Sequence, residues 1–136
     1  MRLATVIFRI LCEALKSITV SHRLSIKNEL TKETHERLFL ALRAARPDLP
    51  IIIMTRPAVG QTGSSRYNTA KKTYDNAIAK GDQNVYFLCG DDLTEFSGRD
   101  GTADGTHPSD IGFYSMSLPV TKVLGQILLK NKYSAL

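Results

Sequence analysis

The sequence predicts an α/β domain built as a three-layer α/β/α sandwich. Two short apolar runs alternate with segments whose apolar residues recur at helical spacing. Neither run shows the polar–apolar alternation of a half-exposed strand, so each is expected to be buried on both faces, as in a parallel sheet. The chain has 136 residues, 43% of them hydrophobic and 23% charged, which is the length and composition of one globular domain.

The first clear helix is predicted to begin at Thr31, a candidate N-cap, and to end near Ala45, before Pro47. His35 on this helix is expected at the surface. The run over residues 49–54 predicts the first buried strand, because it is short, apolar and rich in β-branched residues. The expected inner face of the helix consists of Leu38, Phe39, Leu42 and Ala45.

A loop over residues 57–66 leads into a second helix, predicted over residues 66–80 with Gly81 at the C′ position. Residues 84–89 predict the second strand, and residues 90–107 a loop rich in Gly and Asp. The expected inner side of the second helix consists of Tyr67, Ala70, Tyr74, Ala77 and Ile78.

The last helix is predicted to begin at Ser109 or Asp110. Pro119 is expected to kink or split it, because proline removes a backbone donor. Two strands are few for a parallel sheet, so the sheet is expected to be incomplete within this chain. The side chains expected to face inward are Phe113, Met116, Val120, Leu124, Ile127 and Leu128.

In the N-terminal segment, residues 1–28, the apolar residues over 6–18 could form a helical face, but no clear caps or turn signals accompany them, and residues 20–25 favour neither helix nor strand. Residues 29–136 are expected to form the folded unit. The longest apolar stretch, residues 3–15, is interrupted by Arg9 and Glu13, so it is too short for a membrane span and a poor signal peptide. No membrane association is expected. As it stands the sequence indicates a cytoplasmic protein, although a signal peptide lost with an N-terminal half would change that.

The net charge of +5 is spread along the chain, with no run of like charges and no interleaved aromatic residues. This pattern favours a solvated, mildly basic surface over a nucleic-acid site; salt-dependent nucleic-acid binding is a lesser alternative. Cys12 and Cys89 lack metal-ligand spacing and are expected to be buried thiols. No metal or cofactor is expected.

The strongest chemical signal is the pair Asp104 and His107, in a stretch that reads Asp-Gly-Thr-His-Pro-Ser-Asp-Ile-Gly-Phe-Tyr. An Asp three residues before a His can accept one imidazole N–H and leave the other nitrogen free to take a proton, as a general base requires. The alternative is a surface loop in which Asp104 makes only an Asx-turn.

This stretch resembles the last conserved block of the SGNH/GDSL hydrolases, in which Asp-x-x-His is followed by Pro and a helix. The resemblance covers roughly residues 29–130 and includes residues 34–39, 44–52, 55–57 and 81–87. It implies a flavodoxin-like sandwich that hydrolyses a small-molecule ester, with acylated carbohydrates among the candidates, through an acyl-enzyme. It also implies that His107 is the general base and that Asp104 fixes its tautomer.

The Gly-Asp-Ser motif that carries the family's nucleophile is not in this sequence: Gly81-Asp82 precedes Gln83, and Gly90-Asp91 precedes Asp92. The oxyanion-hole residues of the family would fall before residue 29, and no role follows for His22 or Arg23. The chain therefore resembles the C-terminal half of such an enzyme, and negligible activity is expected from it alone. The alternative is a non-catalytic α/β module that associates with a partner or with itself through an exposed sheet edge.

Other candidates carry weaker signals. Ser64 and Ser65 lack the spacing of a nucleophile elbow or a P-loop, and a helix N-cap is expected there. Arg56 ends the first strand and either points into a cleft or is solvated. Asp91 and Asp92 are expected to point apart, because adjacent side chains of an extended loop do so.

Overall fold

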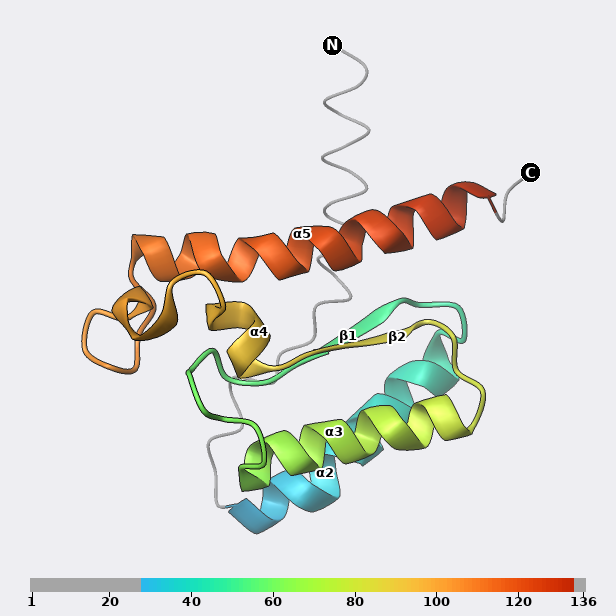
Figure 1. The fold of residues 1–136 in the computed structure, drawn as a ribbon. Helices are drawn as coiled ribbons and strands as arrows, with labels where there is room; N and C mark the ends of the chain where they lie inside the picture. Colours follow the sequence, from blue (N-terminus) through green and yellow to red (C-terminus); the bar gives the residue numbers. More distant parts are fainter. Residues whose placement is uncertain (1–27, 134–136) are drawn as a thin grey trace.

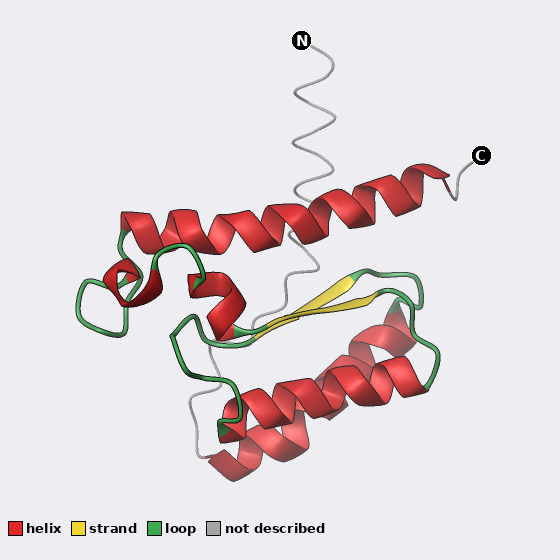
Figure 2. Ribbon diagram, in the orientation of Figure 1, coloured by secondary structure: helices red, strands yellow, loops and turns green. Residues whose placement is uncertain are grey.

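The computed structural model describes residues 28–133, so most of the atypical segment 1–28, with Cys12, His22 and Arg23, lies outside the described residues. Helices and strands alternate as predicted (Figure 1). The segment predicted as a loop, residues 90–107, also contains a short α-helix and a 3-10 helix (Figure 2). The elements are α2 (Asn28–Ala45), β1 (Ile51–Met54), α3 (Ser65–Ala79), β2 (Val85–Leu88), α4 (Gly90–Thr94), η1 (Gly98–Gly101) and α5 (Asp110–Tyr133).

The two strands pair in parallel, with Ile51 opposite Val85 and Met54 opposite Leu88, which confirms the parallel prediction. Within the described residues the sheet has these two strands only. α2 and α3 lie on one face of the sheet, and α5 lies on the other (Figure 1). Helices cover both faces of the sheet, so side chains on both faces of each strand are shielded from solvent. This explains why the two strand sequences are continuously apolar.

Successive residues of β1 serve two separate cores, because side chains alternate across a strand. Ile51 and Ile53 pack with residues of α2 and α3, namely Phe39, Ala70 and Ala77, and with Val85. Ile52 packs on the other face with Leu88 of β2, Leu93 of α4 and Ile127 of α5. The sheet thus joins two halves of the core that share no side chain.

Helix boundaries differ from prediction at one end. α2 begins at Asn28 rather than Thr31. No Gly or Pro stands between these residues to prevent another helical turn, and Asn is itself favoured at helix starts. The C-terminal end at Ala45 is as predicted, and Gly81 has the expected positive φ, 84°.

Pro119 was predicted to kink or split the last helix; it does not split it, because α5 runs through it from Asp110 to Tyr133. The predicted inner face of α5 is correct in part. Its side chains that pack inward are those of Met116, Val120, Leu124 and Ile127, whereas Phe113 and Leu128 are exposed. α5 carries apolar residues on all sides, so its sequence does not identify the buried face. Leu38, Ala45 and Ile78, expected inward on α2 and α3, are also exposed.

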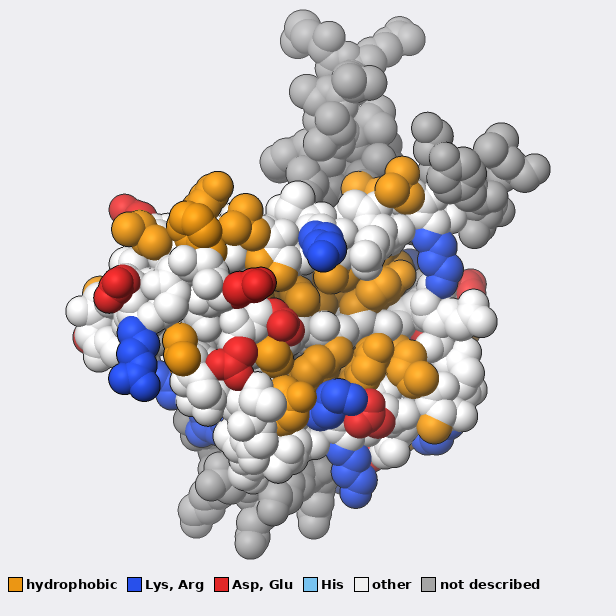
Figure 3. All heavy atoms as spheres, viewed as in Figure 1, with side chains coloured by type: hydrophobic (Ala, Val, Ile, Leu, Met, Phe, Trp, Pro, Cys, Tyr) orange, Lys and Arg blue, Asp and Glu red, His pale blue; other side chains and the backbone are white. Residues whose placement is uncertain are grey.

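Large apolar side chains gather on the solvent side of the first half of α5 (Figure 3). A second apolar band lies between α5 and α3, at the level of the strands (Figure 3). The exposed large apolar residues of α5 and the preceding segment are Phe96, Ile111, Phe113, Tyr114, Leu118, Leu128 and Leu129.

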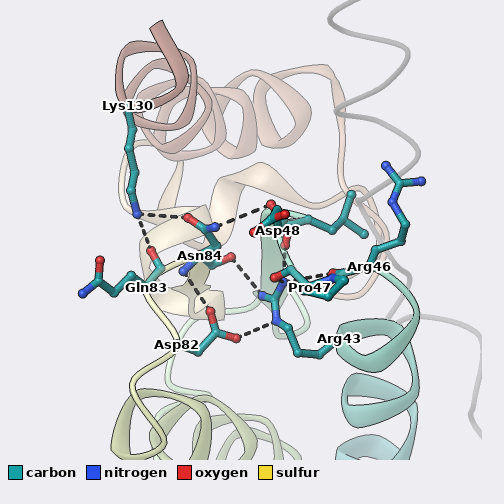
Figure 4. Close-up of polar contacts among 9 residues, drawn as sticks. Arg43, Arg46, Pro47, Asp48, Asp82, Gln83, Asn84 and Lys130 are labelled. Atoms are coloured by element: carbon teal, nitrogen blue, oxygen red, sulfur yellow. Dashed lines mark hydrogen bonds and ion pairs between the residues drawn. The ribbon is translucent and has the colours of Figure 1, made fainter. Parts of the chain in front are cut away.

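At the starts of the strands, Arg43 joins α2 to both strand entries (Figure 4). Its Nε donates to Asp82 Oδ2 at 2.7 Å, and its Nη1 donates to the carbonyl oxygens of Pro47 at 2.8 Å and Leu49 at 2.6 Å. The Arg43 and Asp82 side chains are only 18% and 14% exposed. One guanidinium therefore satisfies backbone carbonyls that the chain turn before β1 leaves unpaired.

Candidate active site

The loop that carries Asp104 and His107 is closed at its base by backbone hydrogen bonds. Ala103 N donates to His107 O at 2.9 Å, and Ser109 N donates to Gly101 O at 2.9 Å. At the tip, Gly105 has a φ of 77°, a conformation that is costly for residues with a Cβ. The loop follows η1 and precedes α5, on the side of the molecule where both strands end (Figure 1). In open α/β sheets this is the side on which ligands bind.

Asp104 holds His107 with both carboxylate oxygens. Oδ1 accepts hydrogen bonds from the backbone N–H of Thr106 at 2.9 Å and of His107 at 2.7 Å, while Oδ2 lies 2.7 Å from His107 Nδ1. The Asx-turn considered as an alternative is therefore present, and it uses a different oxygen from the one that contacts the imidazole. The turn orients the carboxylate toward the ring.

The protonation state of the pair follows from these contacts. The hydrogen bond from the His107 N–H, together with those from the His107 ring and the Thr106 N–H, lowers the pKa of Asp104 to about 2. At neutral pH the carboxylate is ionised and only accepts hydrogen bonds, so Nδ1 must carry the proton. In the neutral imidazole Nε2 is then a free acceptor, and within residues 28–133 it has no hydrogen-bonding partner.

Nε2 is also accessible: the side chains of His107 and Asp104 are 77% and 55% exposed. A general base must reach its proton donor directly, so this exposure suits a donor that approaches from outside the described residues. The same exposure means that the ion pair itself stabilises the fold little.

Two glycines fix the loop against α5. A Cβ atom at Gly112 would lie 2.0 Å from the carbonyl oxygen of Gly101, and one at Gly101 would lie 2.2 Å from Ser97 Oγ. Both glycines are buried. Their lack of side chains lets η1 approach the first turn of α5 closely, which places His107 directly before that turn.

Ser115 connects the same segments from inside. Its buried hydroxyl donates to Leu93 O at 3.0 Å and accepts from Ser97 N at 3.3 Å. Sequence reasoning missed this residue, as well as Gly101. Gly112 had a signal in the Asp-x-Gly-Phe spacing, whereas a buried Ser within an apolar helix gives none.

The ends of both strands are tied together behind this loop. Gly90 N donates to the Thr55 hydroxyl at 2.7 Å, and a Cβ atom at Gly90 would lie 2.1 Å from Arg56 O. Asp91 accepts hydrogen bonds from Gly60 N at 2.5 Å, Thr62 N at 3.1 Å and the Thr62 hydroxyl. These contacts, led by that from Thr62, lower the pKa of Asp91. The loop after β1 is thereby fastened to α4.

The weaker candidates have structural roles. Ser64 is the N-cap of α3, as predicted, because its Oγ accepts from Tyr67 N. Asp91 and Asp92 contact different partners, but they lie in α4 and not in the extended loop that was predicted: Asp92 forms a capping box with Cys89 at the start of this helix. Cys89 is half-buried, and burial raises the pKa of its thiol.

His35 is not a surface residue, which corrects the prediction. It is half-buried between α2 and α3, with Nδ1 2.8 Å from the Thr73 hydroxyl, and burial lowers its pKa. Arg56 is half-buried, and its guanidinium makes no hydrogen bond or ion pair within residues 28–133. Its side chain is not part of the contacts that hold the Asp104–His107 loop.

Comparison with known proteins identifies the family. The model of the GDSL-like lipase/acylhydrolase family matches residues 21–125, which is most of the chain and includes Asp104, His107 and Gly112. The chain belongs to the GDSL-like lipase/acylhydrolase family. The match begins eight residues before residue 29, the start of the resemblance predicted from the sequence. No curated protein matches significantly.

The fold of this GDSL-like chain is similar to that of a salicylyl-acyltransferase from a tetracycline biosynthetic pathway, with a TM-score of 0.53 and 19% sequence identity. The similarity covers 72% of this chain but 33% of the acyltransferase, so the chain spans about a third of that structure's length. Together the two findings establish an α/β GDSL-like protein with a small parallel sheet.

In the described part of the chain, no group of three or more His, Cys, Asp or Glu side chains is placed so that it could hold a metal ion. Among residues 28–133, no helix has the length and apolar character required to cross a bilayer.

Proposed function

We propose that the chain carries the general base and the orienting acid of a Ser-His-Asp acyl-transfer site, with His107 as base and Asp104 as acid. The observation that supports this most is the 2.7 Å contact between His107 Nδ1 and Asp104 Oδ2, combined with an exposed Nε2 that has no partner among the described residues. The nucleophilic Ser comes from outside residues 1–136.

In this mechanism Nε2 takes the proton from the Ser hydroxyl as the Ser oxygen attacks the acyl carbonyl. The imidazolium then gives that proton to the departing alcohol, and an acyl-enzyme is left. Water, deprotonated by the same Nε2, hydrolyses the acyl-enzyme and regenerates the Ser. Asp104 stays ionised throughout and stabilises the imidazolium, as its low pKa favours.

Three serines within the described residues have structural contacts that do not suit a nucleophile. Ser64 caps α3, Ser115 is buried between α5 and Leu93, and the Ser109 hydroxyl accepts from Gly112 N. We therefore expect the isolated chain to have negligible esterase activity.

The full domain in this proposal is a three-layer, flavodoxin-like sandwich, to which residues 29–136 contribute the C-terminal half, preceded in the sequence by the atypical segment 1–28. Helices on both faces of a parallel sheet support it, as does the coverage of only a third of the similar acyltransferase. Missing strands would pair with the edge of β1.

The substrate class is a small-molecule ester, with acylated carbohydrates among the candidates. Family membership supports this, since the family acts on acyl groups. The similar solved structure transfers a salicylyl group, so the acceptor of the acyl group is either water or an alcohol, depending on which reaches the acyl-enzyme.

The test has two parts. The isolated chain is assayed with p-nitrophenyl acetate, and its turnover is expected to equal that of the His107→Ala variant. Turnover by the native chain that is lost in His107→Ala would disprove the expected inactivity, although it would support the role of His107. The DNA upstream is then read in all three frames. A strand ending in Gly-Asp-Ser there supports the proposal, and an upstream sequence without such a strand contradicts it.

A second candidate function is a non-catalytic module that binds a partner through the sheet edge. The ladder uses Ile51 N and Thr55 N to reach β2, so the intervening N–H groups of Ile52 and Met54 face away from it. Hydrogen exchange at these two amides is expected to slow with protein concentration if the edge pairs. Identical exchange rates at every concentration would contradict this candidate.

A further inference from the structure

The outer face of α5 presents a continuous apolar stripe, which we name the α5 surface. Ile111, Tyr114 and Leu118 are exposed and share one helix face at i, i+3 and i+7 spacing. Phe96 extends the stripe, since its ring meets that of Tyr114 edge-on with centroids 5.4 Å apart. Figure 3 shows apolar side chains gathered over this half of α5. Such a stripe on a surface helix indicates a docking site.

The α5 surface lies in an acidic environment. Residues 91–110 contain six acidic side chains and one basic side chain, Arg99, which is a net charge of −5. Three of these carboxylates, those of Glu95, Asp100 and Asp110, are exposed, and no salt bridge neutralises them within the described residues. A partner for this surface must therefore be apolar and basic.

This chain presents such a surface itself, on the opposite side of the sheet. Arg37, Leu40, Ala41 and Ala44 are all exposed on the outer face of α2 at i, i+3, i+4 and i+7 spacing, and we name them the α2 surface. Arg37 is the charged residue among the four, and the segment that contains them, residues 34–80, has eight basic and three acidic side chains, a net charge of +5. α2 and α5 lie on opposite faces of the sheet (Figure 1).

We propose that the chain self-associates head to tail, with the α5 surface of one copy packed on the α2 surface of a second copy. Bulky side chains of α5 fit against the small Ala41 and Ala44, as ridges fit into grooves between helices. A symmetric contact of two α5 surfaces would bring two acidic segments together, whereas the head-to-tail contact joins opposite charges. Because each copy keeps one free surface of each kind, association is open-ended.

Sedimentation of the full 136-residue chain tests this directly. The weight-average mass is expected to rise with concentration beyond that of a dimer at low salt, and to fall at 1 M salt, where charges are screened beyond about 3 Å. A mass that stays at one chain over the micromolar to millimolar range overturns the proposal. Sedimentation does not depend on ester hydrolysis, so this test succeeds or fails independently of the test of the proposed function.

Charge-swap variants identify the surfaces. Arg37→Glu and Asp110→Arg are each expected to weaken association by on the order of 100-fold, because like charges then face each other. An equimolar mixture of the two variants again places opposite charges together at both contacts, so copies of the two variants are expected to alternate and to associate beyond the dimer, as the native chain does. Arg66→Glu and Asp48→Arg, which alter exposed charges elsewhere, serve as controls and should associate like the native chain.

Two results would overturn the assignment of these surfaces. If both charge-swap variants associate as the native chain does, the contact lies elsewhere, for example at the sheet edge. If the mixture stays monomeric while each variant is folded by circular dichroism, the two surfaces do not meet.

Discussion

The two ends of the sheet are built for different purposes. At the starts of the strands, the Arg43 guanidinium is mostly buried and bonds to Asp82 and to several carbonyls of the turn before β1. At the ends of the strands, the Asp104–His107 pair has contacts of the same length but is mostly exposed. Similar geometry therefore has different consequences: the buried junction supports stability, and the exposed pair leaves one imidazole nitrogen accessible.

The largest expected effect comes from removing the buried junction. Arg43→Met should lower the free energy of unfolding by about 3 kcal/mol, because it leaves Asp82 and several carbonyls without their donor. Urea unfolding measures this. Arg46→Met is the matched control, since the Arg46 side chain points away from the junction (Figure 4) and should change stability by less than about 0.5 kcal/mol. Equal effects of both variants would show that the junction contributes no more than a surface charge.

At the other end, stability depends on glycine packing rather than on the ion pair. Gly112→Ala should lower the free energy of unfolding by about 1–3 kcal/mol, because the new methyl group would collide with Gly101 O. The imidazole resonances of His107 should shift as the loop moves. Gly125→Ala is the control: nothing lies within 4 Å of its Cβ position, so it should stabilise α5 by about 0.5–1 kcal/mol. Destabilisation by both variants would contradict this account of Gly112.

His35, which lies between α2 and α3, makes a pH-dependent contribution to stability. Burial lowers the pKa of His35, so the folded state binds its proton less readily than the unfolded chain. The stability that neutral His35 contributes is complete above its unfolded pKa, about 6.5, and is lost as the pH falls through the lowered folded value. The native chain should therefore lose stability between pH 7 and pH 5 more steeply than His35→Gln does. Parallel pH profiles would contradict the assignment.

The smallest effect on stability is expected from Asp104→Ala, because the pair is exposed. Its effect should instead appear in the imidazole tautomer of His107, measured by nitrogen NMR. The native chain should hold the Nδ1–H form, and the variant should shift toward Nε2–H. An unchanged tautomer would show that Asp104 does not orient the ring.

Acid titration tests the same contact in the native chain. Since the pKa of Asp104 is about 2, the carboxylate's stabilising contacts are complete above its unfolded pKa, about 3.9, and are lost as the pH falls toward 2. The carboxyl carbon resonance of Asp104 should therefore titrate near pH 2. Titration near pH 4 would mean that the hydrogen bonds to the carboxylate are not maintained in solution.

Patterns of residue type within a single element predicted the buried strands and the end of α3. The apolar run at Ile51–Met54 predicted a strand covered on both faces, and Gly81 predicted a helix end with a positive φ. Faces of apolar helices were less predictable: Phe113 and Leu128 match the period of α5 yet are exposed. A period identifies a face only when one side of the helix is polar.

In the candidate site, too, some contacts could be predicted from the sequence and others could not. Asp104 and His107 lie three residues apart, so a turn of local hydrogen bonds brings them together, and their spacing in the sequence was sufficient to predict it. Gly101, Ser97 and Ser115 hold that turn in place from positions up to 18 residues apart, and their contacts carry no pattern in the sequence. The partner of His35, Thr73, is 38 residues away, so no local pattern indicates that His35 is half-buried.

By itself, then, the sequence determined the α/β class, the two apolar strands, the family and the Asp-x-x-His pair, because each depends on residue types that stand close together in the chain. Tertiary structure alone decided which face of α5 is buried, how closely η1 approaches it, and that His107 Nε2 is left exposed. Those features depend on contacts between segments that are distant in the chain, and such contacts are selected by the packing of the whole domain.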